Sequence, residues 1–312
     1  MSTPPPWHAE PWLRLRERRE RGSLPHALLL CGPSGMDKRG FSERLQRALL
    51  CKAPVDGEAC GQCRACTLFD AGTHPDRIRI GFEERKDGVL RKEIVVHQIR
   101  ALSERLSKAS QFGGWQIACI DPADAMNPAA SNALLKTLEE PGASRLLVLV
   151  ADAPWKLPAT IRSRCQRIEF RLPDSDVALA WLKQAGVRHA DAALAAAAGN
   201  PGLARRWAEQ GQLAERDKVR ADLRALAEGR GEAAALAAGW AGDAAVQRLW
   251  FAAQAAVDEL RARAAGQPGG LGSRLSDSQL GAWYAQANRV REAFDGPLRK
   301  DLLMLELLVA WH

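Results

Sequence analysis

The stretch ALLLCGPSGMDKRGF, residues 27–41, joins an apolar run to a glycine-containing loop and then to a helical pattern. This order is typical of a phosphate-binding loop in a parallel α/β sheet. Against the pattern G-x-x-x-x-G-K-[ST], the loop retains two glycines and the lysine: Gly32, Gly35 and Lys38. It has Asp37 in place of the second glycine and Arg39 in place of the hydroxyl residue. The loop alone leaves three interpretations open: a degenerate nucleotide site, an accidental glycine-rich turn, or a loop kept for another purpose.

Three residues argue against ATP hydrolysis. Arg39 cannot coordinate Mg²⁺, and at about 4 Å the Asp37 carboxylate would repel a phosphate charge by roughly 1 kcal/mol in water, or about 4 kcal/mol at an effective dielectric constant of 20. The apolar run 115–120 leads into Asp121, after which Pro122 occupies the position of the base that orients the attacking water. Because proline cannot accept a proton, we expect neither productive ATP binding nor hydrolysis by this chain.

The first half of the chain alternates β-rich runs with helical patterns. The expected strands cover residues 27–31, 76–80, 116–121, 146–151 and 167–170. Helical patterns between them cover residues 41–50, 95–106 and 129–140. Such alternation predicts a parallel sheet with helices on both faces. The β signal disappears after residue 172, so we expect a small helical module over 173–208 and a larger helical region over 209–312.

The composition indicates a folded protein with a polyanionic partner. Of the 312 residues, 46% are hydrophobic and 26% charged, as in soluble globular proteins of two or three domains. The net charge of +7 favours nucleic acid as a partner. The basic helical pattern over residues 12–21 is better explained as a solvated face, because two glutamates interrupt its charge. The N-terminus has no apolar signal core and no run could span a membrane, so we expect a cytoplasmic protein.

Four of the seven cysteines have the spacing C-x8-C-x2-C-x2-C: Cys51, Cys60, Cys63 and Cys66. Four thiolates can close a tetrahedral Zn²⁺ shell, and the short spacings let neighbouring sulfurs converge on one ion. The sequence therefore predicts a zinc-binding insertion at 51–66. A closed shell of four protein ligands makes this metal structural. Free buried thiols and an iron–sulfur cluster are the alternatives.

Two further motifs are SNALLKTLEEP at residues 131–141 and TIRSRC at residues 160–165. Together with the loop and the cysteines they closely resemble the bacterial clamp-loader branch of the AAA+ ATPases, over essentially the first 208 residues. The resemblance implies an α/β plus all-α fold. Its parts would be an AAA+ (RecA-like) parallel-sheet module over 1–172, a small helical lid over 173–208 and a C-terminal helical collar for oligomerisation over 209–312. The degenerate loop and Pro122 resemble a subunit of this branch that does not hydrolyse ATP.

The resemblance also implies partners and a role for one arginine. The partners would be gamma/tau ATPase subunits and a delta subunit, in a pentameric complex of the DNA polymerase III holoenzyme, a DNA-directed DNA polymerase. That complex opens a sliding clamp and places it on primed DNA. The motif Ser163-Arg164-Cys165 would face the nucleotide site of the neighbouring ATPase subunit, so that Arg164 acts in trans as an arginine finger. An ion pair with a carboxylate of its own domain is the alternative for Arg164.

Lys136 lies in a segment that in clamp loaders faces the DNA, and a phosphate contact or a solvated side chain are the two interpretations. Two functions from other classes remain open at this stage. An active AAA+ ATPase of the gamma/tau type would bind Mg-ATP on its own. A free-standing zinc-containing DNA-binding protein would bind primed DNA as a monomer.

Overall fold

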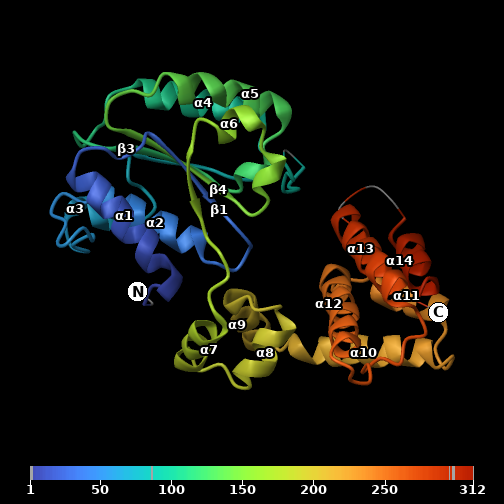
Figure 1. The fold of residues 1–312 in the computed structure, drawn as a ribbon. Helices are drawn as coiled ribbons and strands as arrows, with labels where there is room; N and C mark the ends of the chain where they lie inside the picture. Colours follow the sequence, from blue (N-terminus) through green and yellow to red (C-terminus); the bar gives the residue numbers. More distant parts are fainter. Residues whose placement is uncertain (1–2, 86, 295, 297–298, 312) are drawn as a thin grey trace. The chain divides into compact units, whose positions relative to one another are not determined.

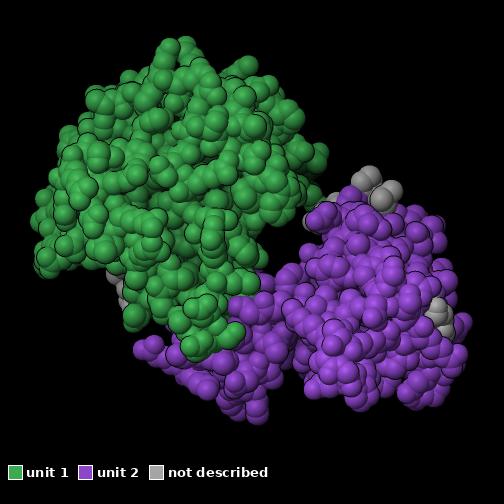
Figure 2. Space-filling view, in the orientation of Figure 1, with its two compact units in different colours: residues 1–177, 200–202 green, residues 178–199, 203–312 purple. Residues whose placement is uncertain are grey.

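The chain forms two compact units in the computed structural model, which describes residues 3–85, 87–294, 296 and 299–311. The first unit comprises residues 1–177 together with 200–202, and the second comprises residues 178–199 and 203–312 (Figure 2). The first unit contains the sheet, and the second unit is helical (Figure 1).

The first unit is built on a five-stranded sheet in which all the strand pairs formed by described residues are parallel. The strands lie in the order β2-β3-β4-β1-β5. Their bounds are β1 Ala27–Cys31, β2 Arg77–Ile80, β3 Gln116–Ile120, β4 Arg145–Ala151 and β5 Gln166–Glu169. Because β3, β4 and β1 are neighbours, the segments that follow these strands meet at one edge of the sheet.

Helices cover both faces of this sheet, with α4, α5 and α6 on one face and α1 and α2 on the other (Figure 1). Alternate residues of a strand face opposite sides, so Leu29 of β1 belongs to the core beneath α4 and α5, whereas Leu28 and Leu30 belong to the core beneath α1 and α2. Strands buried on both faces explain the continuous apolar runs in the sequence. The helices of this unit are α1 Ala9–Glu20, α2 Lys38–Leu50, α3 Arg64–Asp70, α4 Val96–Ser107, α5 Pro128–Glu139 and α6 Ala159–Arg162, with short 3-10 helices η1 Pro6–His8, η2 Ala123–Ala125 and η3 Pro154–Lys156.

The second unit packs its helices around one apolar core rich in alanine, leucine and tryptophan. The rings of Trp283 and Trp311 lie edge to face, 4.6 Å apart, and each indole N–H donates a hydrogen bond to a backbone carbonyl. The helices after the sheet are α7 Ser175–Gln184, α8 Ala190–Ala196, α9 Pro201–Glu209, α10 Leu213–Ala227, α11 Ala233–Trp240, α12 Ala245–Ala264, α13 Asp277–Ala293 and α14 Lys300–Val309. The first residues of α7 and of α9 belong to the first unit. The division of this helical part into a lid over 173–208 and a collar over 209–312 stays a prediction.

The expected fold class is confirmed. All five expected strands are present, each displaced by no more than one residue at either end. The helix expected from residue 41 begins earlier, at Lys38, because the Asp37 side chain accepts a hydrogen bond from the Gly40 backbone and caps it. No helix within the described ranges combines the length and apolar character needed to cross a bilayer.

Candidate functional site

The loop after β1 has the backbone geometry of a phosphate-binding loop. Gly32 has φ +137°, and a Cβ there would lie 2.2 Å from the Phe170 carbonyl oxygen, so only glycine fits. Gly35 also has positive φ. Asp37 stands where the pattern has glycine and adopts the left-handed conformation, with φ +55°. That conformation costs a typical non-glycine residue roughly 1–2 kcal/mol, although short polar side chains tolerate it best.

The side chain of Lys38 is buried and contacts groups of its own chain. Its side chain is 1% exposed, and its ammonium lies 2.6 Å from a carboxylate oxygen of Asp152, the residue that follows β4. The same ammonium donates hydrogen bonds of 2.6 Å to the carbonyl oxygens of Gly32 and Pro33. The two carbonyls use two of the three ammonium donors, and the contact with Asp152 is an ion pair without a hydrogen bond.

Arg39 lies where the pattern would place the metal-binding hydroxyl, and it pairs with two carboxylates. Its Nε donates a hydrogen bond of 2.9 Å to Asp121 Oδ2, and its Nη2 lies 2.8 Å from Asp121 Oδ1 in an ion pair. Its Nη1 lies 3.6 Å from Asp152. Burial tends to lower the pKa of Arg39, but Asp121 and Asp152 more than offset this and raise it. Burial raises the pKa of Asp121, which Arg39 only partly offsets. A guanidinium therefore neutralises the acidic groups that could otherwise hold a divalent cation.

Two segments outside the pattern hold the loop in place. The Trp7 indole donates a hydrogen bond of 3.0 Å to the Met36 carbonyl, and His8 Nε2 lies 3.0 Å from the same oxygen. His8 is buried, and burial lowers its pKa. From residues 200–202, which belong to the first unit, the Asn200 amide donates a hydrogen bond of 2.7 Å to the Ser34 carbonyl. The loop is thus held by hydrogen bonds to the carbonyl groups of Ser34 and Met36.

The end of β3 supplies no base. Pro122 follows Asp121, as the sequence shows, and it has no proton acceptor on its side chain. Asp124, the next carboxylate, accepts a hydrogen bond of 2.8 Å from the Ala153 backbone. Its Oδ2 therefore joins the segments after β3 and β4.

The four cysteines of the insertion converge on one point. Their sulfur atoms all lie within 4.8 Å of one another, and the Cys51 sulfur is 3.5 Å from Cys60 and 3.8 Å from Cys63. A tetrahedral ZnS₄ centre with Zn–S bonds of about 2.3 Å has sulfurs about 3.8 Å apart, so the residues fit this ion. Backbone N–H groups, chiefly those of Lys52 and Cys66, lower the pKa of Cys63 to about 6, whereas burial raises the pKa of Cys66 to about 12. The cluster can hold a metal ion.

Arg164 is the middle residue of the short segment between α6 and β5, before β5 begins, whereas the loop residues described above follow the end of β1. Its Nη2 is 2.6 Å from Glu139 at the end of α5, and its Nη1 donates a hydrogen bond of 3.0 Å to the Thr160 carbonyl. About a third of its side chain is exposed. In the single chain, Arg164 thus forms an ion pair with Glu139 of its own domain, as the alternative interpretation expects. Lys136 is exposed on α5, the same helix that carries Glu139.

The sequence reasoning missed Asp152, His8 and Asn200. Asp152 could have been found, because it directly follows an apolar strand, and the carboxyl ends of parallel strands meet at one edge. His8 and Asn200 carry no comparable signal. They lie 28 and 166 residues from the loop groups they contact, and only the folded chain brings them together.

Comparison with known proteins decides the family. The family model described as "DNA polymerase III, delta subunit" matches residues 7–174, more than half of the chain. DNA polymerase III subunit delta' of Pseudomonas aeruginosa is 37% identical over 239 residues, which are 75% of this chain and 70% of that relative. The chain belongs to the DNA polymerase III delta-prime family. The Escherichia coli subunit delta' is also 37% identical, over 202 residues that are 62% of this chain and 59% of that relative.

A crystal structure of a DNA polymerase III gamma subunit-related protein from Thermotoga maritima matches with 14% identity and a TM-score of 0.48, covering 96% of this chain and 97% of that one. Membership of the delta-prime family confirms the resemblance to clamp-loader proteins that was inferred from the sequence motifs. The chain is accordingly a clamp-loader subunit. The roles of Arg164, Lys136 and the four cysteines stay predictions and are argued next.

Proposed function

We propose that this chain is a non-hydrolysing subunit that assists ATP-dependent loading of the sliding clamp onto primed DNA. One observation carries the proposal: the candidate nucleotide site is filled by the chain's own ion pairs. Lys38 is bonded to Asp152 and to two carbonyls of its loop. Arg39 spans Asp121 and Asp152.

Binding of Mg-ATP would have to break this network. The ammonium of Lys38 would exchange three short internal contacts for phosphate oxygens. The metal would have to displace Arg39 from Asp121, because the guanidinium lies against both carboxylate oxygens. The Asp37 carboxylate would remain close to the phosphates. Each of these changes is unfavourable, so the site has lost both its phosphate-binding lysine and its metal position.

We propose that the chain instead acts on the ATP of a neighbouring gamma/tau subunit through Arg164. The guanidinium is partly exposed, and its partner Glu139 is itself half exposed, so the exchange of Glu139 for a phosphate costs little. A planar guanidinium can donate two parallel hydrogen bonds to phosphate oxygens, which suits the charge that develops on the γ-phosphate. Ser163 and Cys165 flank it, and the burial of Cys165 fixes the start of β5.

The proposed partners are the gamma/tau and delta subunits of the clamp loader, with primed DNA bound by the assembled complex. Lys136 is the candidate for a phosphate contact, since it is exposed on α5. For the insertion we propose a structural Zn²⁺ held by Cys51, Cys60, Cys63 and Cys66. When bound, the metal would cross-link the end of α2 to the start of α3 and would take no part in chemistry, because its four positions are filled by protein.

Assembly and nucleotide binding test the proposal together. The purified chain is mixed with gamma/tau and delta subunits and examined by native mass spectrometry, and its Mg-ATP affinity alone is measured by isothermal titration calorimetry. We expect one copy of the chain per complex and no heat of Mg-ATP binding up to millimolar concentration. Micromolar binding of Mg-ATP by the isolated chain would favour the active-ATPase alternative. Failure to assemble, together with binding of primed DNA by the monomer, would favour the free-standing DNA-binding alternative.

A further inference from the structure

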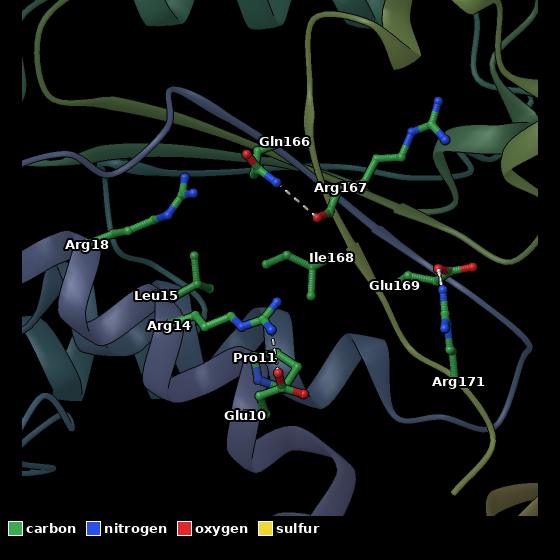
Figure 3. Close-up of a pocket in the computed structure, with 10 residues that line it drawn as sticks. All are labelled: Glu10, Pro11, Arg14, Leu15, Arg18, Gln166, Arg167, Ile168, Glu169 and Arg171. Carbon is green, nitrogen blue, oxygen red and sulfur yellow. Dashed lines mark hydrogen bonds and ion pairs between the residues drawn. The ribbon is translucent and has the colours of Figure 1, made fainter.

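An open groove runs between α1 and β5 on the first unit (Figure 3). Its volume is about 500 Å³, and its lining comes from one side of α1 and from the strand and the residues after it. Leu15 and Ile168 lie between the two elements, and Arg14 and Arg18 project from α1 (Figure 3). None of these residues belongs to the nucleotide-site remnant, the cysteine cluster or the Arg164 segment.

The strand in this groove has an unpaired edge among the described residues. β5 is the last strand of the sheet and pairs only with β1 in that part of the chain. The Phe170 N–H donates to Cys31 of β1, so alternation along the strand directs the peptide groups of Arg167 and Glu169 away from β1. The Arg167 carbonyl accepts only a long bond of 3.3 Å from the neighbouring Gln166 side chain. An edge of this kind can pair with an added strand.

The charge of the groove is positive. Four arginines line it against two glutamates: Arg14, Arg18, Arg167 and Arg171 against Glu10 and Glu169. Arg14 pairs with Glu10, and Arg171 pairs with Glu169. Within the described part of the chain, Arg18 and Arg167 form no ion pair, and both are exposed. Ile168 and Phe170 pack beneath α1 and α2, so alternation along β5 puts Arg167 on the other face of the sheet from Arg18. A strand added to this edge would therefore meet one free guanidinium on each of its faces.

We propose that this groove binds an extended acidic segment of a partner protein, which adds to the free edge of β5. The occupant would pair its main chain with Arg167 and Glu169. On its face towards α1 it would place an apolar side chain over Ile168 and an acidic one near Arg18, and on its opposite face an acidic side chain near Arg167. The unpaired peptide groups and the apolar floor favour a polypeptide, which can use both. The two glutamates in the walls disfavour a continuous phosphodiester backbone, whose charges have no neutral positions between them.

A defined peptide tests this directly. The probe is a fluorescein-labelled peptide of nine residues with a central leucine and glutamates at both odd and even positions, so that acidic side chains lie on both faces of the added strand. Its binding to the full chain is followed by fluorescence anisotropy. We expect saturable binding that weakens with salt. Reversing both free charges, in the double variant Arg18→Glu with Arg167→Glu, should weaken binding by about tenfold or more, since each exposed ion pair contributes roughly 1.4- to 5-fold and each reversal adds repulsion. The exposed Arg188 in the second unit gives the matched control, Arg188→Glu, which should bind as the unaltered chain does.

The backbone contribution is tested with a second probe. The same peptide, N-methylated at alternate residues, keeps its charges but loses the main-chain donors that would pair with β5, and it should bind at least about fivefold more weakly. Equal binding of the two peptides, or equal binding by the charge-reversal and control variants, would overturn the proposal. Binding of a single-stranded 20-nucleotide DNA that is lost in the charge-reversal variant, with no binding of the peptide, would also overturn it and assign the groove to nucleic acid.

Discussion

Replacement of Lys38 by alanine should lower the free energy of unfolding of this protein. In a working nucleotide site, the same change removes ligand binding and leaves the stability of the fold unchanged. The variant deletes an ammonium that is 1% exposed and leaves the Asp152 carboxylate and the carbonyls of Gly32 and Pro33 without their donor. The two carbonyls can recruit water once the side chain is gone. The carboxylate keeps its charge beside Arg39 alone.

The magnitude lies between two limits. Removing one partner of a fully buried ion pair costs about 3–5 kcal/mol, whereas an exposed pair contributes about 0.2–1 kcal/mol. The Asp152 side chain is a third exposed, although the oxygen that faces Lys38 is buried, so we expect an intermediate fall of about 2 kcal/mol in the free energy of unfolding. For a unit of the size of residues 1–177 with 200–202, this corresponds to a fall in Tm of about 4–8 °C.

The assay is thermal and urea unfolding with and without Mg-ATP. Lys38→Met keeps the aliphatic stem and isolates the loss of charge, and Lys136→Ala, on the exposed face of α5, should leave the Tm unchanged within about 1 °C. Millimolar Mg-ATP should shift the Tm of none of these proteins. A Lys38→Ala variant as stable as the unaltered chain, combined with a Tm of the unaltered chain that Mg-ATP raises, would refute the reasoning and make Lys38 a nucleotide ligand.

Three further predictions concern the other ion pairs and the cysteines. Burial raises the pKa of Asp121 and Arg39 partly offsets this, so Arg39→Ala should raise that pKa further. A carboxyl whose pKa is higher in the folded than in the unfolded state destabilises the fold at pH values above the unfolded-state pKa. The loss of unfolding free energy should therefore be full at pH 8 and shrink towards pH 4, and a loss independent of pH would contradict this. The purified chain should contain one zinc per molecule by elemental analysis, and Cys60→Ser should lower that content; four freely titratable thiols with no zinc would reject the metal site. Glu139→Gln should release Arg164 while costing under about 1 kcal/mol of stability, and a larger loss in urea unfolding would mean that the pair is a structural element.

The sheet could be predicted from the sequence because its strands are buried on both faces. Runs such as residues 27–31 and 146–151 are apolar at every position because helices cover both sides, and that pattern is visible without any tertiary information. The convergence of the four sulfurs could also be predicted, because it depends mainly on local spacing. Cys60, Cys63 and Cys66 lie close in sequence, so a tight turn suffices to bring them together.

The partners of Lys38 and Arg39 could not be predicted in this way. The sequence predicts that Arg39 does not hold Mg²⁺, but it does not show what Arg39 contacts instead. Asp121 lies 82 residues away, and its ion pair with Arg39 depends on the order of the strands. The strand order places β1 between β4 and β5 and so puts Asp152 beside Lys38. Single-chain patterns report which residues are apolar or capped. They do not report which two loops meet at the edge of a sheet.

The measurement that tests the account most directly is ATP turnover by the reconstituted clamp loader, stimulated by primed DNA, with and without Arg164 in this chain. Arginine fingers contribute roughly 10³–10⁵-fold at the sites they complete, so Arg164→Ala should sharply lower turnover at the neighbouring site. Arg164→Lys keeps the positive charge but lacks the paired N–H donors of the planar guanidinium, so it should not restore the rate. Native mass spectrometry must show that each variant still assembles. Turnover equal to that of the unaltered complex, with assembly intact, would contradict the claim that this chain acts on a neighbour's nucleotide through Arg164.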